Sequence, residues 1–212
     1  MPKLPMRYLR YSLLLMVAFS CASEYKLLQP AMLEQSCVSK IKPRGFTTSW
    51  FTTSVDVVGK HLSGLLLIKN QPDSSTRVVF TSEAGITFFD FEFTKNGTFA
   101  VKRIVSQLDK KPIIQTLRKD FELTLGIPFR GVTPEVWTMN TEKWYGVKQK
   151  NETSYFITDT ECASLLRLEL GSTRKKKTEV FIRGKDPHDP DSVQIKHYNF
   201  AMQIELRKLM RE

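Results

Sequence analysis

The stretch ITFFDFEFTKNGTFAVKRI, residues 86–104, decides the fold of this chain. Apolar and polar side chains alternate on both sides of Asn96-Gly97, and this pattern is the strongest short signal for a β-hairpin. In its first half every second residue is an aromatic ring: Phe89, Phe91 and Phe93. Because Asp90 and Glu92 alternate with these rings, the two kinds of side chain lie on opposite faces of one strand. The stretch therefore predicts two antiparallel strands with one strongly apolar face.

The same period of two precedes this hairpin. Three earlier segments rich in Thr, Val, Leu and aromatic residues show it: residues 46–58, 61–69 and 77–81. Such residues suit a pleated, half-buried surface. Turn-forming residues separate the segments, at Gly59-Lys60 and at residues 71–74. We expect a five-stranded antiparallel meander over residues 46–104.

The second half of the chain also reads as short strands. Six segments with strand periodicity follow: residues 142–147, 153–158, 164–170, 178–183, 193–197 and 202–208. The basic run at residues 174–177 is expected to form a solvated hairpin tip. The total is about ten or eleven antiparallel strands.

Two segments break the strand rhythm and predict helices. Residues 108–125 place an apolar stripe on one side, formed by Ile113, Ile114, Leu117, Phe121 and Leu125. Gly126 suits the end of this helix. Residues 30–41 predict a shorter helix with Pro30 in its first turn. Residues 126–141 contain Pro, Gly and little charge, and we expect an irregular loop or lid there.

This inventory predicts a mainly β fold of the α+β class. A sheet of this size needs cover for its apolar face, and two helices cannot plug a closed cylinder. We therefore expect a strongly curved antiparallel sheet that forms an incomplete barrel, with the helices laid across its open side.

The interior of such a sheet can be interpreted in two ways. It is either an ordinary packed core or an apolar cavity, and packing density decides between them. Which alternate residues of the strands at 61–69 and 77–81 join the phenylalanine face depends on the register. The candidates for lining a cavity are Phe89, Phe91, Phe93, Val78 and Phe80. Phe129 and Trp137, in the expected loop, are the candidates for its mouth.

The first twenty residues have the composition of an export signal. Basic residues precede a short apolar run at residues 12–19, which is too short to span a bilayer as a helix. Cys21 follows a small residue, and this arrangement resembles the lipobox of bacterial lipoproteins. The resemblance implies that residues 1–20 are removed and that Cys21 carries a lipid anchor. Residues 21–29 then form an acylated tether and residues 30–212 a single domain. The alternative is an ordinary secretory signal in which Cys21 is incidental.

The chain carries a formal charge of +10, of which the leader holds three cations, so that 10 − 3 leaves +7 on the remainder. This charge could favour an anionic membrane surface or an acidic partner. No nucleic-acid-binding motif accompanies it, and we expect no nucleic-acid partner. Cys37 and Cys162 either pair in a disulfide or remain two small buried side chains.

The sequence offers no recognisable catalytic or metal site. It has no GxSxG elbow, phosphate loop or dinucleotide motif, and His61, His188 and His197 are scattered. The run DPHDPD at residues 186–191 resembles a cation site, but its two prolines favour a rigid turn. We therefore expect neither an enzyme nor a cofactor or metal.

The order of helix, meander, helix, loop, strands and closing hairpin resembles the lipoprotein carrier and receptor proteins of the bacterial Lol system. Residues 62–125 and the ending PDSVQIKHYNFAMQIELRKL, residues 190–209, carry this resemblance. It implies a half-barrel with an apolar cavity for the acyl chains of membrane lipids or lipoproteins, and a role in lipoprotein localisation. The alternative is a lipoprotein of the same fold with a structural or protein-binding role in the envelope and no lipid cargo.

The resemblance also implies a place in the cell. A lipobox cysteine fits the anchored receptor better than the soluble carrier, and the cell would be a Gram-negative bacterium. Ala22 and Ser23 place no aspartate directly after Cys21. By the sorting rule of such lipoproteins, this implies anchoring in the outer membrane.

Overall fold

The computed structural model describes residues 23–41, 46–186 and 188–209. The predicted leader at residues 1–20 and the predicted anchor Cys21 lie outside the described residues. Among the described residues, no helix has both the length and the apolar character needed to cross a bilayer.

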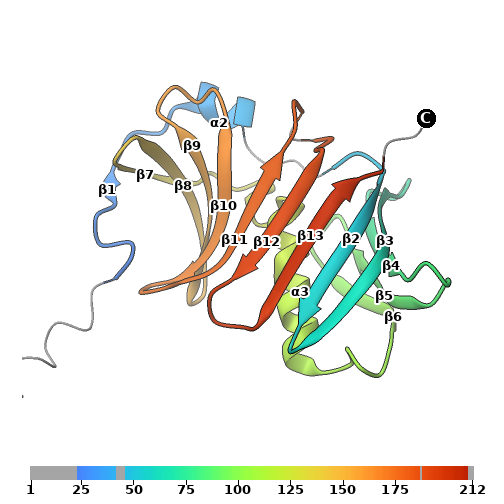
Figure 1. Ribbon diagram of the computed structural model, residues 1–212. Helices are drawn as coiled ribbons and strands as arrows, with labels where there is room; N and C mark the ends of the chain where they lie inside the picture. The colour runs from blue at the N-terminus through green and yellow to red at the C-terminus, as the bar shows by residue number, and fades with distance from the viewer. Residues whose placement is uncertain (1–22, 42–45, 187, 210–212) are drawn as a thin grey trace, which may run out of the picture.

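The described chain forms one antiparallel sheet of thirteen strands, in the order β1-β7-β8-β9-β10-β11-β12-β13-β2-β3-β4-β5-β6 (Figure 1). The first six strands in the sequence are β1 Gln29–Pro30, β2 Ser49–Val57, β3 Lys60–Asn70, β4 Thr76–Thr81, β5 Thr87–Phe93 and β6 Phe99–Ile104. The others are β7 Glu135–Met139, β8 Glu142–Gln149, β9 Glu152–Asp159, β10 Leu165–Ser172, β11 Lys176–Arg183, β12 Ser192–His197 and β13 Met202–Lys208. The edge strands β1 and β6 do not pair with each other, so the sheet stays open. This confirms the expected incomplete barrel and the meander β2–β6.

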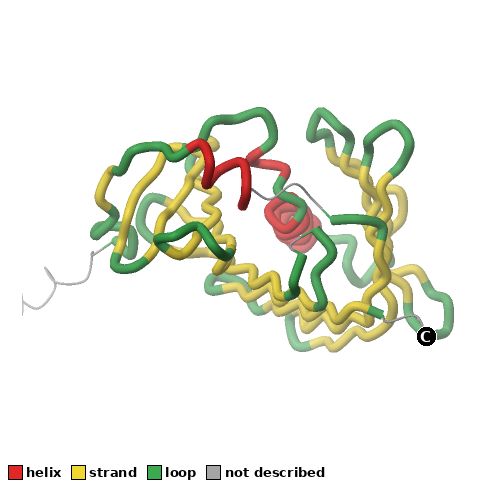
Figure 2. Tube along the Cα trace, turned by 90° about the horizontal axis from the view of Figure 1, so that it is seen from above, coloured by secondary structure: helices red, strands yellow, loops and turns green. Residues whose placement is uncertain are grey.

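The sheet bends strongly around one face (Figure 2). Gly64 in β3 shows one cause, because a Cβ atom there would lie 2.0 Å from the carbonyl oxygen of Thr81. A side chain at this position would push β4 away. Irregular register between β4 and β5 and between β5 and β6 adds to the bend.

The concave face carries the main apolar core. On it Val78 pairs with Phe91 and Phe80 with Phe89 across β4 and β5. From β3, the register adds Leu66 and Ile68, which are fully buried, whereas Leu65 and Leu67 turn toward the other face. The sequence left this choice open because register is a long-range property.

One long helix lies against the concave face. It is α3 Lys111–Thr124, seen end-on inside the curve of the sheet in Figure 2. Gly126 follows it with a left-handed φ of 65°, as expected of a residue that ends a helix. A single turn of 3₁₀ helix, η1 Ile127–Phe129, comes next.

The short helix begins later than predicted. It is α2 Gln35–Ile41, whereas Pro30 belongs to β1 and pairs with Trp137 of β7. Proline is tolerated there because β1 is an edge strand, and the N–H that proline lacks is not needed on the open side.

The expected loop at residues 126–141 contains η1 and the strand β7. Pro128 and Pro134 lie outside β7, and Asn140 adopts a left-handed φ of 55° in the tight turn to β8. The prolines therefore flank this strand without interrupting it. β1 and β7 are the strands that the sequence analysis missed.

Cys37 and Cys162 form a disulfide that joins α2 to the turn between β9 and β10, with 5.5 Å between their Cα atoms. Of the two alternatives that the sequence left open, the structure has the bonded one. Cys162 lies in the turn, not in a strand. The basic run at residues 174–177 forms the tip of the β10–β11 hairpin and the start of β11, as expected.

Candidate functional site

The candidate site is the apolar interior between the sheet and α3. The five residues expected to line it are brought together on the concave face, and each is at most 1% exposed: Val78, Phe80, Phe89, Phe91 and Phe93. The rings of Phe89 and Phe91 stack with centroids 4.5 Å apart. Phe121 of α3 covers Phe89 at 5.8 Å. In this structure the side chains themselves fill the space under the helix.

The buried side of α3 is not wholly apolar. Its Asp120 meets His197 at the end of β12, with 2.8 Å between Oδ1 and Nε2, and both side chains are only 1% exposed. The other ring nitrogen, Nδ1, lies 2.9 Å from the carbonyl oxygen of Met202. Because that oxygen can only accept, Nδ1 carries a proton, and a second proton lies between Nε2 and Asp120.

Burial sets the proton affinity of this pair. Burial raises the pKa of Asp120, although the hydrogen bond and the charge of His197 act to lower it. Burial by itself lowers the pKa of His197, but the hydrogen bond and charge of Asp120, with the Met202 carbonyl, raise it above 6.5 overall. The pair therefore retains its shared proton more strongly than the two groups would in water.

Two polar atoms on the same side of α3 remain unsatisfied. Asp120 Oδ2 and Thr124 Oγ1 are buried and have no hydrogen-bond partner among the described residues. A buried polar group left in this state costs about 1–3 kcal/mol. The packing of α3 on the sheet is therefore weaker than its apolar stripe alone would give.

The start of α3 is also weakly held. Lys110 at its N-cap makes no capping hydrogen bond, and the first turn contains no acidic residue. Lys110 and Lys111 place positive charge at the positive end of the helix dipole. On the outer side, Lys119 binds Glu152 of β9 at 2.7 Å. α3 thus covers the interior with neither a side-chain cap nor an acidic residue in its first turn.

A pocket of about 460 Å³ lies beside this cover, at one end of the interior. It is lined mainly by the β5–β6 turn, α3 and η1, including Lys95, Gly97, Arg118, Ile127, Arg130 and Val132. Arg130 is half-buried, burial lowers its pKa, and it makes no ion pair within the described part of the chain. Its lining mixes charged and polar side chains, Glu122 among them, with the apolar Ile127, Pro128 and Val132.

The two residues expected at the mouth lie elsewhere. Phe129 is fully buried and packs edge-on against Phe156 at 5.1 Å. Trp137 lies on the opposite face of the sheet, where its ring contacts Tyr155 at 6.0 Å. The structure does not bring the two together, and neither lines the pocket beside α3. The expectation failed because β7 is a strand, which turns Val136 inward and Trp137 outward.

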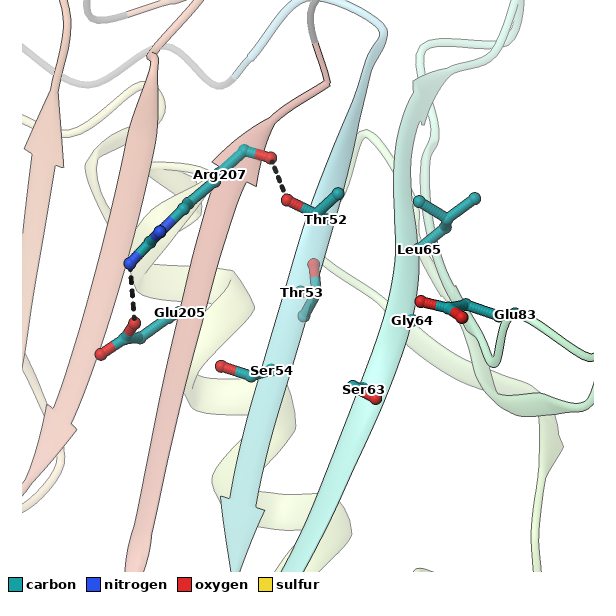
Figure 3. A pocket seen from close by; sticks show the side chains of 9 residues that line it. All are labelled: Thr52, Thr53, Ser54, Ser63, Gly64, Leu65, Glu83, Glu205 and Arg207. Atoms are coloured by element: carbon teal, nitrogen blue, oxygen red, sulfur yellow. Dashed lines mark hydrogen bonds and ion pairs between the residues drawn. The ribbon is translucent and has the colours of Figure 1, made fainter.

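Over β13, β2 and β3 the convex face of the sheet carries mainly polar side chains. A hollow of about 260 Å³ lies on this part of the face; Figure 3 shows the side chains that line it. Its lining includes Ser54, Ser63, Glu83, Glu205 and Arg207. Such a surface suits water better than an acyl chain.

The sequence analysis missed the pair of Asp120 and His197. A signal for it exists, because Asp120 falls between Leu117 and Phe121 on the buried side of the helix. His197 likewise follows Val193 and Ile195 on the inward face of β12. A charged residue on an apolar face calls for a buried partner, but its identity depends on the tertiary fold.

Among the described residues, no group of three or more His, Cys, Asp or Glu side chains could hold a metal ion. The two carboxylates that alternate with the phenylalanines of β5 bind cations on the opposite face of the sheet. Asp90 pairs with Arg77, and Glu92 with Lys102 at 2.5 Å.

No protein-family model matches the sequence, and no curated protein matches it. Among solved structures, a LolA superfamily protein from Nitrosomonas europaea superposes with a TM-score of 0.52 at 10% identity, over 86% of this chain and 95% of that one. A Vibrio parahaemolyticus domain described as an outer-membrane lipoprotein-sorting protein gives 0.47 at 10% identity, over 83% and 88%. The Mycobacterium tuberculosis lipoprotein LppX gives 0.25 at 12% identity, over 84% and 95%.

Of these three likenesses, the first has a TM-score that bears on the fold. At 10% identity this likeness is evidence about the architecture and not about the activity. The open, curved sheet with a helix across its concave face thus resembles the fold of that LolA superfamily protein.

Proposed function

We propose that this protein is a membrane-anchored lipoprotein that takes up acyl chains of lipids or lipidated proteins between its sheet and α3. The observation that carries the proposal is the apolar concave face covered by one helix that buries unsatisfied polar atoms. Such a helix can leave the sheet at a lower cost in free energy than a helix whose buried side is wholly apolar. Phe89, Phe91, Phe93, Val78 and Phe80 would then line the space that opens.

The free energy gained by burying the apolar side of α3 is comparable to the free energy gained by burying an acyl chain in its place. Four apolar side chains of α3 are buried: Ile113, Leu117, Phe121 and Leu123. At about 1.5–3 kcal/mol each, they contribute roughly 6–12 kcal/mol. An acyl chain that buries about twelve methylenes gains roughly 10 kcal/mol, at about 0.8 kcal/mol per group. A chain can therefore replace the helix on the sheet with little net change in free energy, which reversible transport requires.

The proposed place of action is the outer membrane of a Gram-negative bacterium, and the proposed task is lipoprotein localisation. The lipobox-like Cys21, the residues after it and the Lol-like order of elements support this. No bond is made or broken in such a task, so the protein needs no nucleophile, acid or base.

A second candidate is a lipoprotein of the same fold that carries no lipid. The packed interior favours it, because Phe80, Phe91 and Phe93 have no exposed surface and each of these rings lies 4.5–5.5 Å from another ring. In that case the sheet and α3 form an ordinary core, and the function lies on the outer surface.

Native mass spectrometry of the purified protein with palmitic acid separates the two candidates. Carriage predicts a one-to-one adduct that increases in the variant Asp120→Asn, which weakens the attachment of α3. The matched control is Asp109→Asn, an exposed residue just before the helix, which leaves the adduct unchanged. If neither the parent nor Asp120→Asn retains the fatty acid, the carrier proposal fails.

A further inference from the structure

The first residues that the structure describes are fixed to the sheet. Ser23 Oγ donates to the carbonyl oxygen of Thr173 at 2.9 Å, and the N–H of Glu24 to that of Arg174 at 3.1 Å. The Glu24 carboxylate accepts from the N–H of Lys176 at 3.0 Å. The segment after the predicted anchor is thus bound to the tip of the β10–β11 hairpin, and the two run side by side in Figure 1.

Tyr25 holds this segment against the outer face of the sheet. Its ring stacks on Tyr155 at 5.3 Å and meets Trp144 edge-on at 6.1 Å. A Cβ atom on Gly171 would lie 2.2 Å from the Tyr25 hydroxyl oxygen, so the glycine makes room for the ring. The sequence analysis treated residues 21–29 as a tether, but from Ser23 onward this segment packs against the domain.

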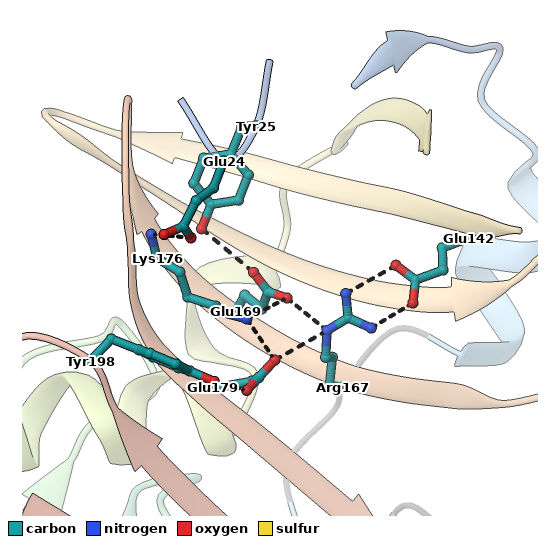
Figure 4. Close-up of polar contacts among 8 residues, drawn as sticks. All are labelled: Glu24, Tyr25, Glu142, Arg167, Glu169, Lys176, Glu179 and Tyr198. Atoms are coloured by element: carbon teal, nitrogen blue, oxygen red, sulfur yellow. Dashed lines mark hydrogen bonds and ion pairs between the residues drawn. The ribbon is translucent and has the colours of Figure 1, made fainter. Parts of the chain in front are cut away.

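A network of charges lies beneath this segment (Figure 4). Arg167 binds Glu142 through two nitrogens, at 2.6 and 2.9 Å, and Glu169 at 2.6 Å. Lys176 binds Glu179 at 2.9 Å. Beside the network, Lys177 binds Glu152 at 2.6 Å. The second half of the basic run is therefore neutralised within the domain.

The first half of the run is not. Arg174 and Lys175 are exposed at the hairpin tip and make no ion pair among the described residues. Lys26 is exposed in the adjoining segment, next to Leu27, whose surface is 67% accessible. Cationic and apolar side chains together suit the headgroup region of a membrane.

The chain length fixes how far this surface can be from the bilayer. Cys21 precedes Ser23 by two residues, which span at most about 7 Å when fully extended. This is less than the Debye length of about 8–10 Å at physiological salt. An anchor on Cys21 would therefore hold the tip within range of the headgroup charges.

From these observations we infer that Lys26, Leu27, Arg174 and Lys175 form the membrane-facing surface of this protein. It would bind the anionic headgroups of the bilayer in which Cys21 is anchored, and so fix the orientation of the domain. The inference needs the anchor but not the acyl-chain cargo.

Labelling of lysines with an acetylating reagent, read by mass spectrometry, tests this surface. The acylated protein is reconstituted in vesicles of phosphatidylcholine, or of phosphatidylcholine with one third phosphatidylglycerol. We expect Lys26 and Lys175 to react about fivefold more slowly in the anionic vesicles, the factor expected for a cation near an anionic surface. High salt should remove the difference. Lys69 and Lys185, exposed at the opposite end of the strands, are internal controls.

Variants make the test specific. Arg174→Glu with Lys175→Glu should abolish the slower labelling of Lys26, whereas Lys69→Glu with Lys185→Glu, with the same change in charge, should retain it. Equal labelling of Lys26 and Lys175 in both kinds of vesicle would overturn the inference. The mass of the N-terminal peptide reports acylation of Cys21 separately, and fatty-acid adducts report the cargo. A result that overturns the membrane-facing surface can thus be told apart from a result that overturns the anchor or the proposed function.

Discussion

Asp120 and His197 form a buried pair that joins α3 to β12, with 2.8 Å between Oδ1 and Nε2. They lie 77 residues apart in the chain and meet only when the helix lies on the sheet. A buried pair of this kind contributes little net stability when intact, but it penalises the loss of either member. It therefore specifies where α3 docks.

Removal of one partner tests this role. We expect His197→Ala to lower the free energy of unfolding by about 3–5 kcal/mol, because Asp120 is left buried without its partner. The double variant Asp120→Leu with His197→Leu should lose much less. Urea unfolding of Asp120→Leu, His197→Leu and the double variant measures the coupling. Additive losses would show that the two groups do not act as a pair.

The pair also makes stability depend on pH. The folded-state pKa of His197 is raised above 6.5, so its contribution is complete below that pH and is lost as the pH rises through the folded value. The raised pKa of Asp120 acts in the same direction. We expect the free energy of unfolding to fall as the pH rises from about 6.5 through the folded-state pKa of the pair, by at most about 1.4 kcal/mol per unit for one proton.

Urea titrations across that range measure this slope. The variant Asp120→Asn with His197→Asn should have a flatter profile. A parent protein whose stability rises over the range would contradict the assignment of a shared proton to the pair.

Phe91 distinguishes a filled core from a lined cavity. Because its ring is fully buried among other rings, Phe91→Ala should cost about 3–5 kcal/mol. If the interior accepts acyl chains, palmitic acid should fill the space and restore part of the loss. Melting curves with and without the fatty acid measure both effects.

Phe156→Ala is the control for this experiment. Phe156 is equally buried but stacks with Tyr145 at 4.7 Å and meets Phe129, in a group of rings separate from the phenylalanines of β5. The fatty acid should not restore its loss. Equal recovery of both variants would indicate non-specific binding.

The disulfide between Cys37 and Cys162 closes a chain separation of 125 residues. Loops of this length lose much entropy on closure, and reduction should lower stability by roughly 2–5 kcal/mol. The seven-residue helix α2 should be affected most, because helices of that length are not stable alone.

Melting curves with and without dithiothreitol measure the effect. The variant Cys37→Ser with Cys162→Ser should melt at the temperature of the reduced protein and ignore the reductant. If dithiothreitol leaves the melting temperature of the parent unchanged, the bond adds no stability.

The features predicted correctly from the sequence are local. Alternation around Asn96-Gly97 predicts the hairpin of β5 and β6, and the apolar stripe over residues 108–125 predicts α3. Gly126 ends that helix because it supplies the left-handed conformation required there. In each case neighbouring residues contain the whole signal. The open barrel followed from these elements, because two helices cannot fill a closed one.

The features that the sequence left open or missed are long-range. β1 is two residues long and exists because it pairs with β7, which lies about one hundred residues later. The inward side of β3 depends on its register with β4, and periodicity alone does not choose between Leu65 and Leu66. The fixed position of Tyr25 likewise depends on Gly171.

The sequence by itself determined the class of fold and the apolar face, because alternation and turn residues are local features of consecutive positions. The anchor on Cys21 stays a prediction from the leader. The tertiary structure alone decided that aromatic rings fill the interior and that Asp120 meets His197. It also decided that the chain from Ser23 onward packs against a basic hairpin tip. Those outcomes depend on how distant segments pack together, and no short stretch of sequence encodes that packing.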